Sequence, residues 1–349
     1  MPIARVPPPP GAHYISRSTA PVRGGSNYLW YDLGANCDRE PYGIVANYAD
    51  PNVRAIVLTQ LASMRSAGMA RINLGINFAH GLTSGSLIDS SSPTAVALAA
   101  QNIAELLADV KAAGFREVLF RFFPAGAIDP SDPSFDPSLV GEQWNLIKTI
   151  RPVLVSAELP YLIDLSVEGA PRDSDLPIIP DPWKYPDNPN WSKAVRALWQ
   201  SYYAAYGSAD TIGFSFITDD DPDKMHSRVR HMRYVYEGNY PQIFALDIYG
   251  DSTASEAAKF ESFDAAMNEE DPNDALGWRK AGVIVSETFY DDPVAAENIA
   301  NAMHSTGRRV YFLVQWPWDR SADAPACGAT NGVNVAPPFT WDVYATYGF

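Results

Sequence analysis

The stretch Val283-Ile284-Val285-Ser286-Glu287-Thr288-Phe289 is a short apolar run that carries a single carboxylate near its end. About four to eight apolar residues bounded by turn signals are typical of a buried strand. In a barrel of parallel strands, the residues at the carboxyl ends of the strands build the active site. The position of Glu287 therefore predicts a strand and a reactive group at the end of that strand.

The same pattern recurs along the chain, with helical segments between the apolar runs. The runs predict eight strands, over residues 28–37, 70–78, 117–123, 161–167, 211–217, 243–249, 283–289 and 310–316. Segments with a period of about 3.6 residues predict helices over residues 53–66, 94–112, 141–156, 191–206, 225–236, 254–267 and 294–305. Alternating strands and helices predict a parallel sheet, and eight such units predict a single (β/α)8 barrel of the α/β class.

The barrel is expected to form one domain over residues 27–349. No linker or shift in composition divides this part of the chain, and 46% hydrophobic residues are ample for a large core. Residues 1–26 contain a run of four prolines, which predicts an extended N-terminal arm. The segment 170–190 is dense in proline and aspartate, and we expect a long ordered loop that forms a wall of the substrate site.

Charge and cysteine content limit the partners and the location of the protein. A formal net charge of −15 and a pI near 4.7 argue against nucleic acid and membrane surfaces, which are bound by clustered Lys and Arg. Cys37 and Cys327 follow strands that would be neighbours in a closed barrel, so a disulfide and two separate thiols both fit the sequence. Residues 1–30 lack the apolar core of a signal peptide, and we expect a mature chain that is extracellular or periplasmic.

Several classes of barrel chemistry lack their characteristic residues in this sequence. The chain has five histidines and no His-x-His pair, which argues against a metal-dependent amidohydrolase. The eight predicted strands contain no lysine, and no glycine-rich phosphate turn follows the last two, which argues against Schiff-base and phosphate-dependent enzymes. We therefore expect neither a metal nor a cofactor. His80, after the second strand, is retained as a residue that lines the site.

Carboxylates and aromatic side chains are what remain at the predicted strand ends. This combination suits a carbohydrate, because the apolar faces of sugar rings stack on aromatic rings while the hydroxyls need polar partners. Trp316 and Trp318 fall on the same side of the eighth strand by its two-residue period, and one of them is expected to face the cleft. A carbohydrate is therefore the expected partner.

These residues resemble the clan of retaining glycoside hydrolases with (β/α)8 barrels, the cellulase-like and β-glycosidase-like families. The clan carries its acid/base glutamate at the end of the fourth strand and its nucleophile at the end of the seventh, which here are Glu168 and Glu287. The resemblance implies hydrolysis of O-glycosidic bonds in a poly- or oligosaccharide by double displacement. It also implies that Tyr249 hydrogen-bonds the nucleophile and that Arg71 keeps the nucleophile charged. Asp247 and a tryptophan of the eighth strand would contact the sugar.

The sequence departs from the pattern of the clan at two positions. Val167 stands where asparagine usually precedes the acid/base glutamate, and Asp247 stands where histidine is common. A second register places the acid/base after the run 211–217, where Asp220 would replace Glu168. Three functions stay open: a retaining hydrolase, an inverting hydrolase that uses Asp220 or Asp247 with Glu287, and a non-catalytic barrel that binds carbohydrate.

Overall fold

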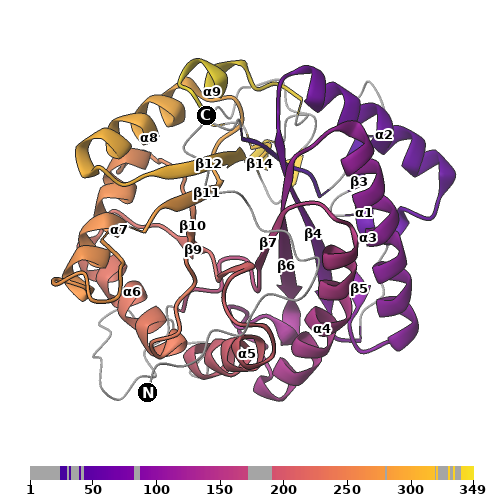
Figure 1. Cartoon of the computed structure of the whole chain (residues 1–349), viewed down its shortest axis with the longest axis horizontal. Coiled ribbons are helices and arrows are strands. Elements are labelled where there is room, and N and C mark those ends of the chain that lie inside the picture. Colours follow the sequence, from indigo (N-terminus) through magenta and orange to yellow (C-terminus); the bar gives the residue numbers. More distant parts are fainter. Residues whose placement is uncertain are drawn as a thin grey trace.

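A computed structural model of the chain describes residues 24–29, 31–32, 39–40, 43–81, 87–171, 191–279, 281–318, 320, 329–330, 333–334 and 339–349. Figure 1 shows strands in the centre of the molecule and helices around them. Four predictions fall on residues outside these ranges, so the structure does not describe them. They are the N-terminal arm up to residue 23, the loop over residues 172–190, and the two cysteines Cys37 and Cys327.

The strands form a parallel barrel, as the sequence predicts. Their order in the sheet is β8-β7-β6-β4-β1-β12-β11-β10-β9, and each neighbouring pair in this order is parallel. Strands β8 and β9 are two halves of one segment, so they close the ring. In chain order the barrel strands are β1 (Gly25–Asn27), β4 (Arg71–Ala79), β6 (Glu117–Ala125), β7 (Tyr161–Asp164), β8 (Thr211–Gly213), β9 (Phe216–Ile217), β10 (Phe244–Asp247), β11 (Val283–Glu287) and β12 (Val310–Gln315).

Seven long helices surround the barrel in the part of the chain that the structure describes, and each lies where the sequence predicts one (Figure 1). Most of them begin with an Asp or Ser N-cap followed by proline, which fixes the first turn. Gly114 and Gly307 end two of them in the left-handed conformation. The helices are α2 (Pro51–Ser66), α3 (Pro93–Ala113), α4 (Val140–Ser156), α5 (Trp191–Tyr206), α6 (Pro222–Tyr236), α7 (Glu256–Glu270) and α8 (Pro293–Thr306).

Shorter elements lie outside the ring of barrel strands and long helices. A short strand β5 (Ile88–Asp89) pairs in parallel with the carboxyl end of β4, and β13 (Ala329–Thr330) pairs with β14 (Val333–Asn334) in a separate two-stranded sheet. Two 3-10 turns, η1 (Gly126–Ile128) and η2 (Pro137–Leu139), lie between β6 and α4. The short helices are α1 (Ile44–Asn47) and α9 (Asp342–Thr346).

The first barrel strand differs from the prediction. Strand β1 (Gly25–Asn27) joins the ring, whereas the predicted run 28–37 contributes β2 (Tyr31–Asp32), which pairs with β3 (Arg39–Glu40) in a separate antiparallel sheet. A Cβ on Gly25 would lie 1.8 Å from the carbonyl oxygen of Arg71, so this strand needs a residue without a side chain and has no apolar run to reveal it. Residues 25 and 26 therefore belong to the barrel and not to the arm.

The fold has an outer and an inner core. The outer core packs the helices against the strands and contains most of the buried apolar residues. The inner core fills the barrel itself with Leu119, Leu162, Ile212, Ile243, Ala245, Ile284, Phe312 and Val314. On four of the strands that carry these inner-core residues, the next inward position towards the carboxyl end is polar. These positions are Arg121, Asp164, Asp247 and Ser286. The interior of the barrel is thus apolar at the level of the inner core and polar towards the carboxyl ends of its strands.

None of the helices in the described ranges combines the length and the apolar character that a membrane crossing requires.

Candidate active site

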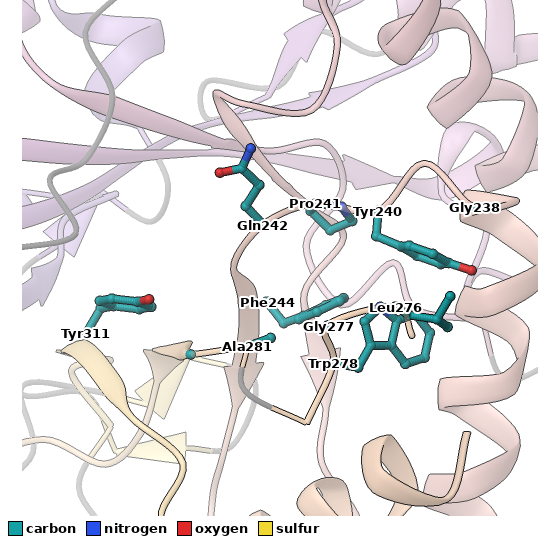
Figure 2. Close-up of a pocket in the computed structure, with 11 residues that line it drawn as sticks. Gly238, Tyr240, Pro241, Gln242, Phe244, Leu276, Gly277, Trp278, Ala281 and Tyr311 are labelled. Atoms are coloured by element: carbon teal, nitrogen blue, oxygen red, sulfur yellow. The ribbon is translucent and has the colours of Figure 1, made fainter. Parts of the chain in front are cut away.

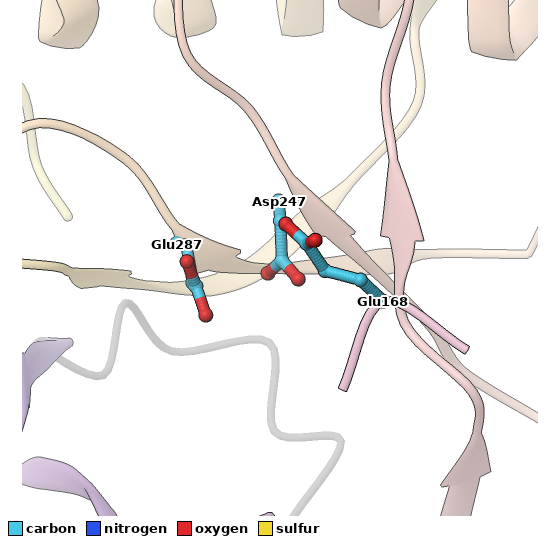
Figure 3. A group of neighbouring side chains, drawn as sticks. All are labelled: Glu168, Asp247 and Glu287. Atoms are coloured by element: carbon cyan, nitrogen blue, oxygen red, sulfur yellow. The ribbon is translucent and has the colours of Figure 1, made fainter. Parts of the chain in front are cut away.

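Three carboxylates meet at the carboxyl ends of the strands. Glu168 follows β7, Asp247 ends β10 and Glu287 ends β11. One carboxylate oxygen from each residue lies within 4.8 Å of the others, and Figure 3 shows Asp247 between the two glutamates. Asp247 and Glu287 are buried, whereas Glu168 is half-buried. The structure therefore brings together three of the residues that the sequence predicts for the site.

The backbone at Glu168 holds that side chain in an unusual conformation. Glu168 has a φ of 51°, in the left-handed region that non-glycine residues rarely adopt. Its backbone N–H donates to the Ser215 hydroxyl at 2.8 Å. Ala170 N–H donates to the carbonyl oxygen of Ser215 at 3.2 Å, and the indole of Trp191 donates to the carbonyl oxygen of Gly169 at 3.1 Å. These contacts stabilise the turn that carries Glu168, as is common at functional sites.

A bulge in β11 turns Glu287 into the barrel. Simple alternation from the inward-facing Ile284 would place Ser286 inward and Glu287 outward. The pairing of β11 with β10 shifts by one residue at this point, so that Asp247 is opposite Glu287. The Ser286 hydroxyl donates to Asp247 Oδ1 at 2.7 Å and holds the extra residue against β10. The bulge thus aims the carboxylate of Glu287 at the group in Figure 3, as bulges next to active sites often do.

Arg121, from the middle of β6, connects the carboxylates beneath the cleft. Its guanidinium donates to Glu287 Oε1, to Asp247 Oδ2 at 2.8 Å and to Asp164 Oδ2 at 3.1 Å. A further bond reaches the Ser215 hydroxyl at 3.1 Å. Arg121, Asp164 and Asp247 are almost completely buried. The single positive charge of Arg121 therefore interacts with three buried carboxylates.

Burial and crowding change the pKa values of this group. Burial raises the pKa of Glu287 well above its ordinary value, and the charge of Asp247 adds to the effect. Arg121 opposes the shift, as does the hydroxyl of Tyr249, which donates to Glu287 Oε2 at 2.9 Å. Burial likewise raises the pKa of Asp164 to about 7. The site therefore binds protons more tightly than isolated carboxylates would.

Aromatic side chains lie next to Glu287. The predicted bond between Tyr249 and Glu287 is confirmed. Ring centroids of Tyr249 and Trp318 lie 5.5 Å apart, and those of Trp316 and Trp318 lie 5.9 Å apart. Phe123 continues this cluster at 6.2 Å from Trp316. Trp316 is buried and Trp318 is half-buried, so Trp318 presents the more accessible face of the two.

Arg71 does not contact Glu287, which corrects the prediction from the family resemblance. Arg71 is the first residue of β4 and therefore lies at the amino end of the barrel, opposite the carboxylates. There it donates to Glu117 and lies over the ring of Phe312, with 4.4 Å between the guanidinium carbon and the ring centroid. The contact with Glu287 that was expected of Arg71 is made by Arg121.

His80 and Asp220 lie apart from the three carboxylates. His80 follows β4 at the carboxyl end of the barrel, but it is exposed, and its Nδ1 lies 2.8 Å from Glu142 Oε2. Asp220 is exposed in the turn before α6, where the neighbouring Asp221 caps the helix and Asp219 pairs with Arg228. The structure thus brings neither residue into the group that contains Glu168 and Glu287.

Sequence reasoning missed Arg121 and Asp164. Both interrupt apolar strands, and each stands two residues beyond an inward-facing leucine, Leu119 or Leu162. A charged residue at an inward position of a barrel strand must find a partner of opposite charge. The alternation of inward and outward residues could therefore have identified Arg121 and Asp164 as inward-facing charged residues. It could not have identified the other residues that they contact.

The three carboxylates are close enough together to surround a cation. Arg121 already provides positive charge to Asp247 and Glu287, and we assign no metal to the site.

A pocket of about 500 Å³ lies at the opposite end of the barrel, near the amino ends of β10, β11 and β12. Figure 2 shows the side chains around it, which include Tyr240, Gln242, Trp278 and Tyr311. The described residues that line it include no carboxylate, histidine, lysine or arginine. The described lining of this pocket therefore offers no carboxylate or imidazole for acid–base chemistry.

No protein-family model and no curated protein matches the chain. Solved structures of similar fold do exist. A GH5-4 broad-specificity endoglucanase from Clostridium longisporum superposes with a TM-score of 0.52 at 12% identity, over 94% of this chain and 96% of that one. A GH5_18 protein from Bifidobacterium longum subsp. infantis gives 0.52 at 13% identity, over 95% and 79%. An endo-β-1,4-glucanase from Xanthomonas axonopodis pv. citri gives 0.50 at 12% identity, over 94% and 98%.

These likenesses confirm the (β/α)8 fold. At such low identity they establish the architecture alone, so the function has to be argued from the site.

Proposed function

We propose that this protein is a glycoside hydrolase that cleaves O-glycosidic bonds with retention of configuration. Glu287 attacks the anomeric carbon while Glu168 gives its proton to the departing glycosidic oxygen. Glu168 then takes a proton from water, the water oxygen attacks the anomeric carbon, and the bond to Glu287 breaks. The observation that carries this proposal is the meeting of Glu168 and Glu287 at the carboxyl ends of two barrel strands.

The separation of the carboxylates favours retention over inversion. Retaining enzymes hold the two carboxyl groups about 5–5.5 Å apart, whereas inverting enzymes need roughly 6.5–9.5 Å to admit a water. One carboxylate oxygen from each of Glu168, Asp247 and Glu287 lies within 4.8 Å of the others, which is nearer to the retaining separation than to the inverting one. Asp220 is exposed and outside the group. An inverting pair with Asp247 or Asp220 therefore has less support.

The aromatic cluster supports a carbohydrate as the substrate. Tyr249 and Trp318 are half-buried beside Glu287 and provide ring faces on which a pyranose can stack, and the buried Trp316 packs against Trp318. The endoglucanases of similar fold point to a poly- or oligosaccharide, and we propose this class without assigning the sugar or the linkage. An extracellular or periplasmic location would suit such a substrate.

The test is hydrolysis of a panel of aryl glycosides and plant and microbial polysaccharides by the wild type and two variants. We expect E287Q to lose about 10⁴-fold or more in kcat, because no nucleophile remains. We expect E168Q to lose about 10²–10⁴-fold, mostly with substrates whose leaving group needs a proton. Added azide should restore turnover to E168A and yield a glycosyl azide, because azide attacks the glycosyl-enzyme without a general base.

Glu158 provides a matched control for Glu168. Both glutamates have a positive φ, of 53° and 51°, but Glu158 is exposed and its carboxylate pairs with Lys111 outside the site. E158Q should therefore hydrolyse as the wild type does. Tight binding of a polysaccharide by the wild type without any release of reducing ends would instead support the carbohydrate-binding barrel.

A further inference from the structure

Asp164 is a buried acid that the proposed mechanism does not use. It is the last residue of β7, its side chain is completely buried, and it points into the barrel beneath the cleft. A carboxylate at such a position needs a compensating charge or a proton, because its ionised form is poorly solvated there. Its contacts decide which of the two it has.

The charges around Asp164 do not balance when every group is ionised. Arg121 from β6 is the cation in contact with it, and the same guanidinium also serves Asp247 from β10 and Glu287 from β11. Tyr236 from α6 is a further titratable group near enough for Asp164 to raise its pKa. Three carboxylates and one guanidinium would leave two negative charges in a buried space. The group therefore retains a proton near neutral pH.

Hydrogen-bond donors indicate which carboxylate holds that proton. Asp247 accepts from Arg121 at 2.8 Å and from the Ser286 hydroxyl at 2.7 Å. Glu287 accepts from Arg121 and from the Tyr249 hydroxyl at 2.9 Å. Asp164 accepts longer bonds, from Arg121 at 3.1 Å and from the Ser215 backbone N–H at 3.3 Å, and the Ser215 side chain also lowers its pKa. Short bonds from donors stabilise the ionised form, so Asp164 is the carboxylate least stabilised as an anion.

We propose that Asp164 is a positioning residue that carries the proton of the Arg121 group and so leaves Glu287 ionised for attack. The neutral Asp164 interacts only weakly with the guanidinium of Arg121, so the positive charge of Arg121 acts on Asp247 and Glu287. The part that concerns attack by Glu287 rests on the proposed function, whereas the location of the proton does not. Burial raises the pKa of both Asp164 and Glu287, so the donors, and not burial, distinguish the two acids.

The first test locates the proton without any substrate. Infrared difference spectra at about pH 6 should show the carbonyl stretch of a protonated carboxylic acid in the wild type, because Asp164 titrates at about 7. The proposed acid/base Glu168 also carries a proton before catalysis, so the comparison is made in the E168Q background, where D164N should lose this band. Asp210 is a matched control, a buried carboxylate that accepts from Arg151 at 2.6 Å and from the hydroxyls of Tyr161 and Tyr202. D210N should keep the band in that background, and a band that persists when D164N is combined with E168Q would overturn the proposal.

The second test uses the dependence of stability on pH. The pKa of Asp164 is raised from 3.8 to about 7 by folding, so the folded chain holds a proton that the unfolded chain releases over this range. The wild type should therefore lose Tm as the pH rises towards 7, relative to D164N, which cannot titrate at this position. D210N should be less stable than the wild type at every pH. A D164N variant that is likewise less stable at every pH, by the same amount, would contradict the proposal.

The third test connects the proton to catalysis. Asparagine imitates the protonated acid, so the acid limb of kcat/KM should stay within about 0.3 pH units of the wild type in D164N. If Asp164 were instead an ionised partner of Arg121, D164N would concentrate the charge of Arg121 on Glu287 and move this limb down by about one unit. Absence of any hydrolysis by the wild type would refute the proposed function, while the infrared result would still decide where the proton lies.

Discussion

At the scale of single residues, the ionisation of Glu287 depends on two donors that hold different oxygens. Arg121 donates to Oε1 from inside the barrel, and Tyr249 donates to Oε2 from the side of the cleft. Both contacts lower the pKa of Glu287 against the larger effects of burial and of Asp247. They also fix the rotation of the carboxylate, which a nucleophile needs in order to reach the anomeric carbon.

The first prediction at this scale concerns Tyr249. Y249F removes one donor from the carboxylate, so the pKa of Glu287 should rise and the acid limb of kcat/KM should move to higher pH. A hydrogen bond to a charged group contributes about 1.5–3 kcal/mol, and kcat/KM should fall by roughly 10- to 100-fold at its optimum. Y290F is the control, because the Tyr290 hydroxyl accepts from the Thr340 N–H at 3.2 Å. An acid limb that stays in place in Y249F would show that this bond has no part in the ionisation of Glu287.

The sequence could indicate three members of the polar group because they lie at or after the ends of apolar runs. Glu287 and Tyr249 were predicted in this way, together with the hydrogen bond between them, and Glu168 was predicted by counting strands. Arg71 was misassigned because a resemblance in composition does not distinguish the amino end of a strand from its middle. The partners of Arg121 come from β7, β10 and β11, and no local pattern in β6 encodes contacts with strands so distant in the chain.

At the scale of elements, the barrel closes through a kink in its fifth strand. Gly213 ends β8 with a φ of 73°, and β9 resumes three residues later with β10 as its neighbour. A Cβ on Gly213 would lie 2.2 Å from the hydroxyl oxygen of Tyr236, which accepts from the Phe214 N–H at 3.2 Å. Ser215, which supports both Glu168 and Arg121, lies within this kink. The glycine therefore positions part of the site.

We expect G213A to lower the free energy of unfolding by about 2–4 kcal/mol, because the left-handed conformation and the collision with Tyr236 both add cost. G207A separates the two effects, since Gly207 has a φ of 75° and a Cβ added there would meet no atom within 4 Å. It should lose only about 1 kcal/mol. Chemical denaturation of both variants measures the difference, and equal losses would show that the contact with Tyr236 is unimportant.

The ends of the helices were predictable to within about three residues, and in α2, α3 and α8 the caps, prolines and period all agree. Strand β1 was not predictable from the sequence, since it has only three residues and two of these are glycine and serine. Its place is set by close backbone contact with β4 and β12, which is a tertiary constraint. The bulge at Ser286 was equally hidden, because it arises from pairing with β10 and not from β11 itself.

At the scale of the whole molecule, the barrel separates stability from chemistry. Towards the amino ends of its strands the interior is apolar apart from the buried Arg71–Glu117 pair, whereas charged inward side chains of four strands and an aromatic cluster gather towards the carboxyl ends. This polarity is general for (β/α)8 enzymes, in which the loops after the strands carry the function. A net charge of −15 agrees with a neutral substrate more readily than with an anionic one.

The measurement that tests the central claim most directly is the trapping of the covalent intermediate. The wild type would be incubated with activated 2-deoxy-2-fluoro glycosides of the sugars that it hydrolyses, and the intact protein and its peptides would be weighed by mass spectrometry. We expect one sugar per chain, on the peptide that contains Glu287, and no adduct on E287Q. Hydrolysis that proceeds without an adduct and releases a product of inverted configuration would contradict the account, as would an adduct on another residue.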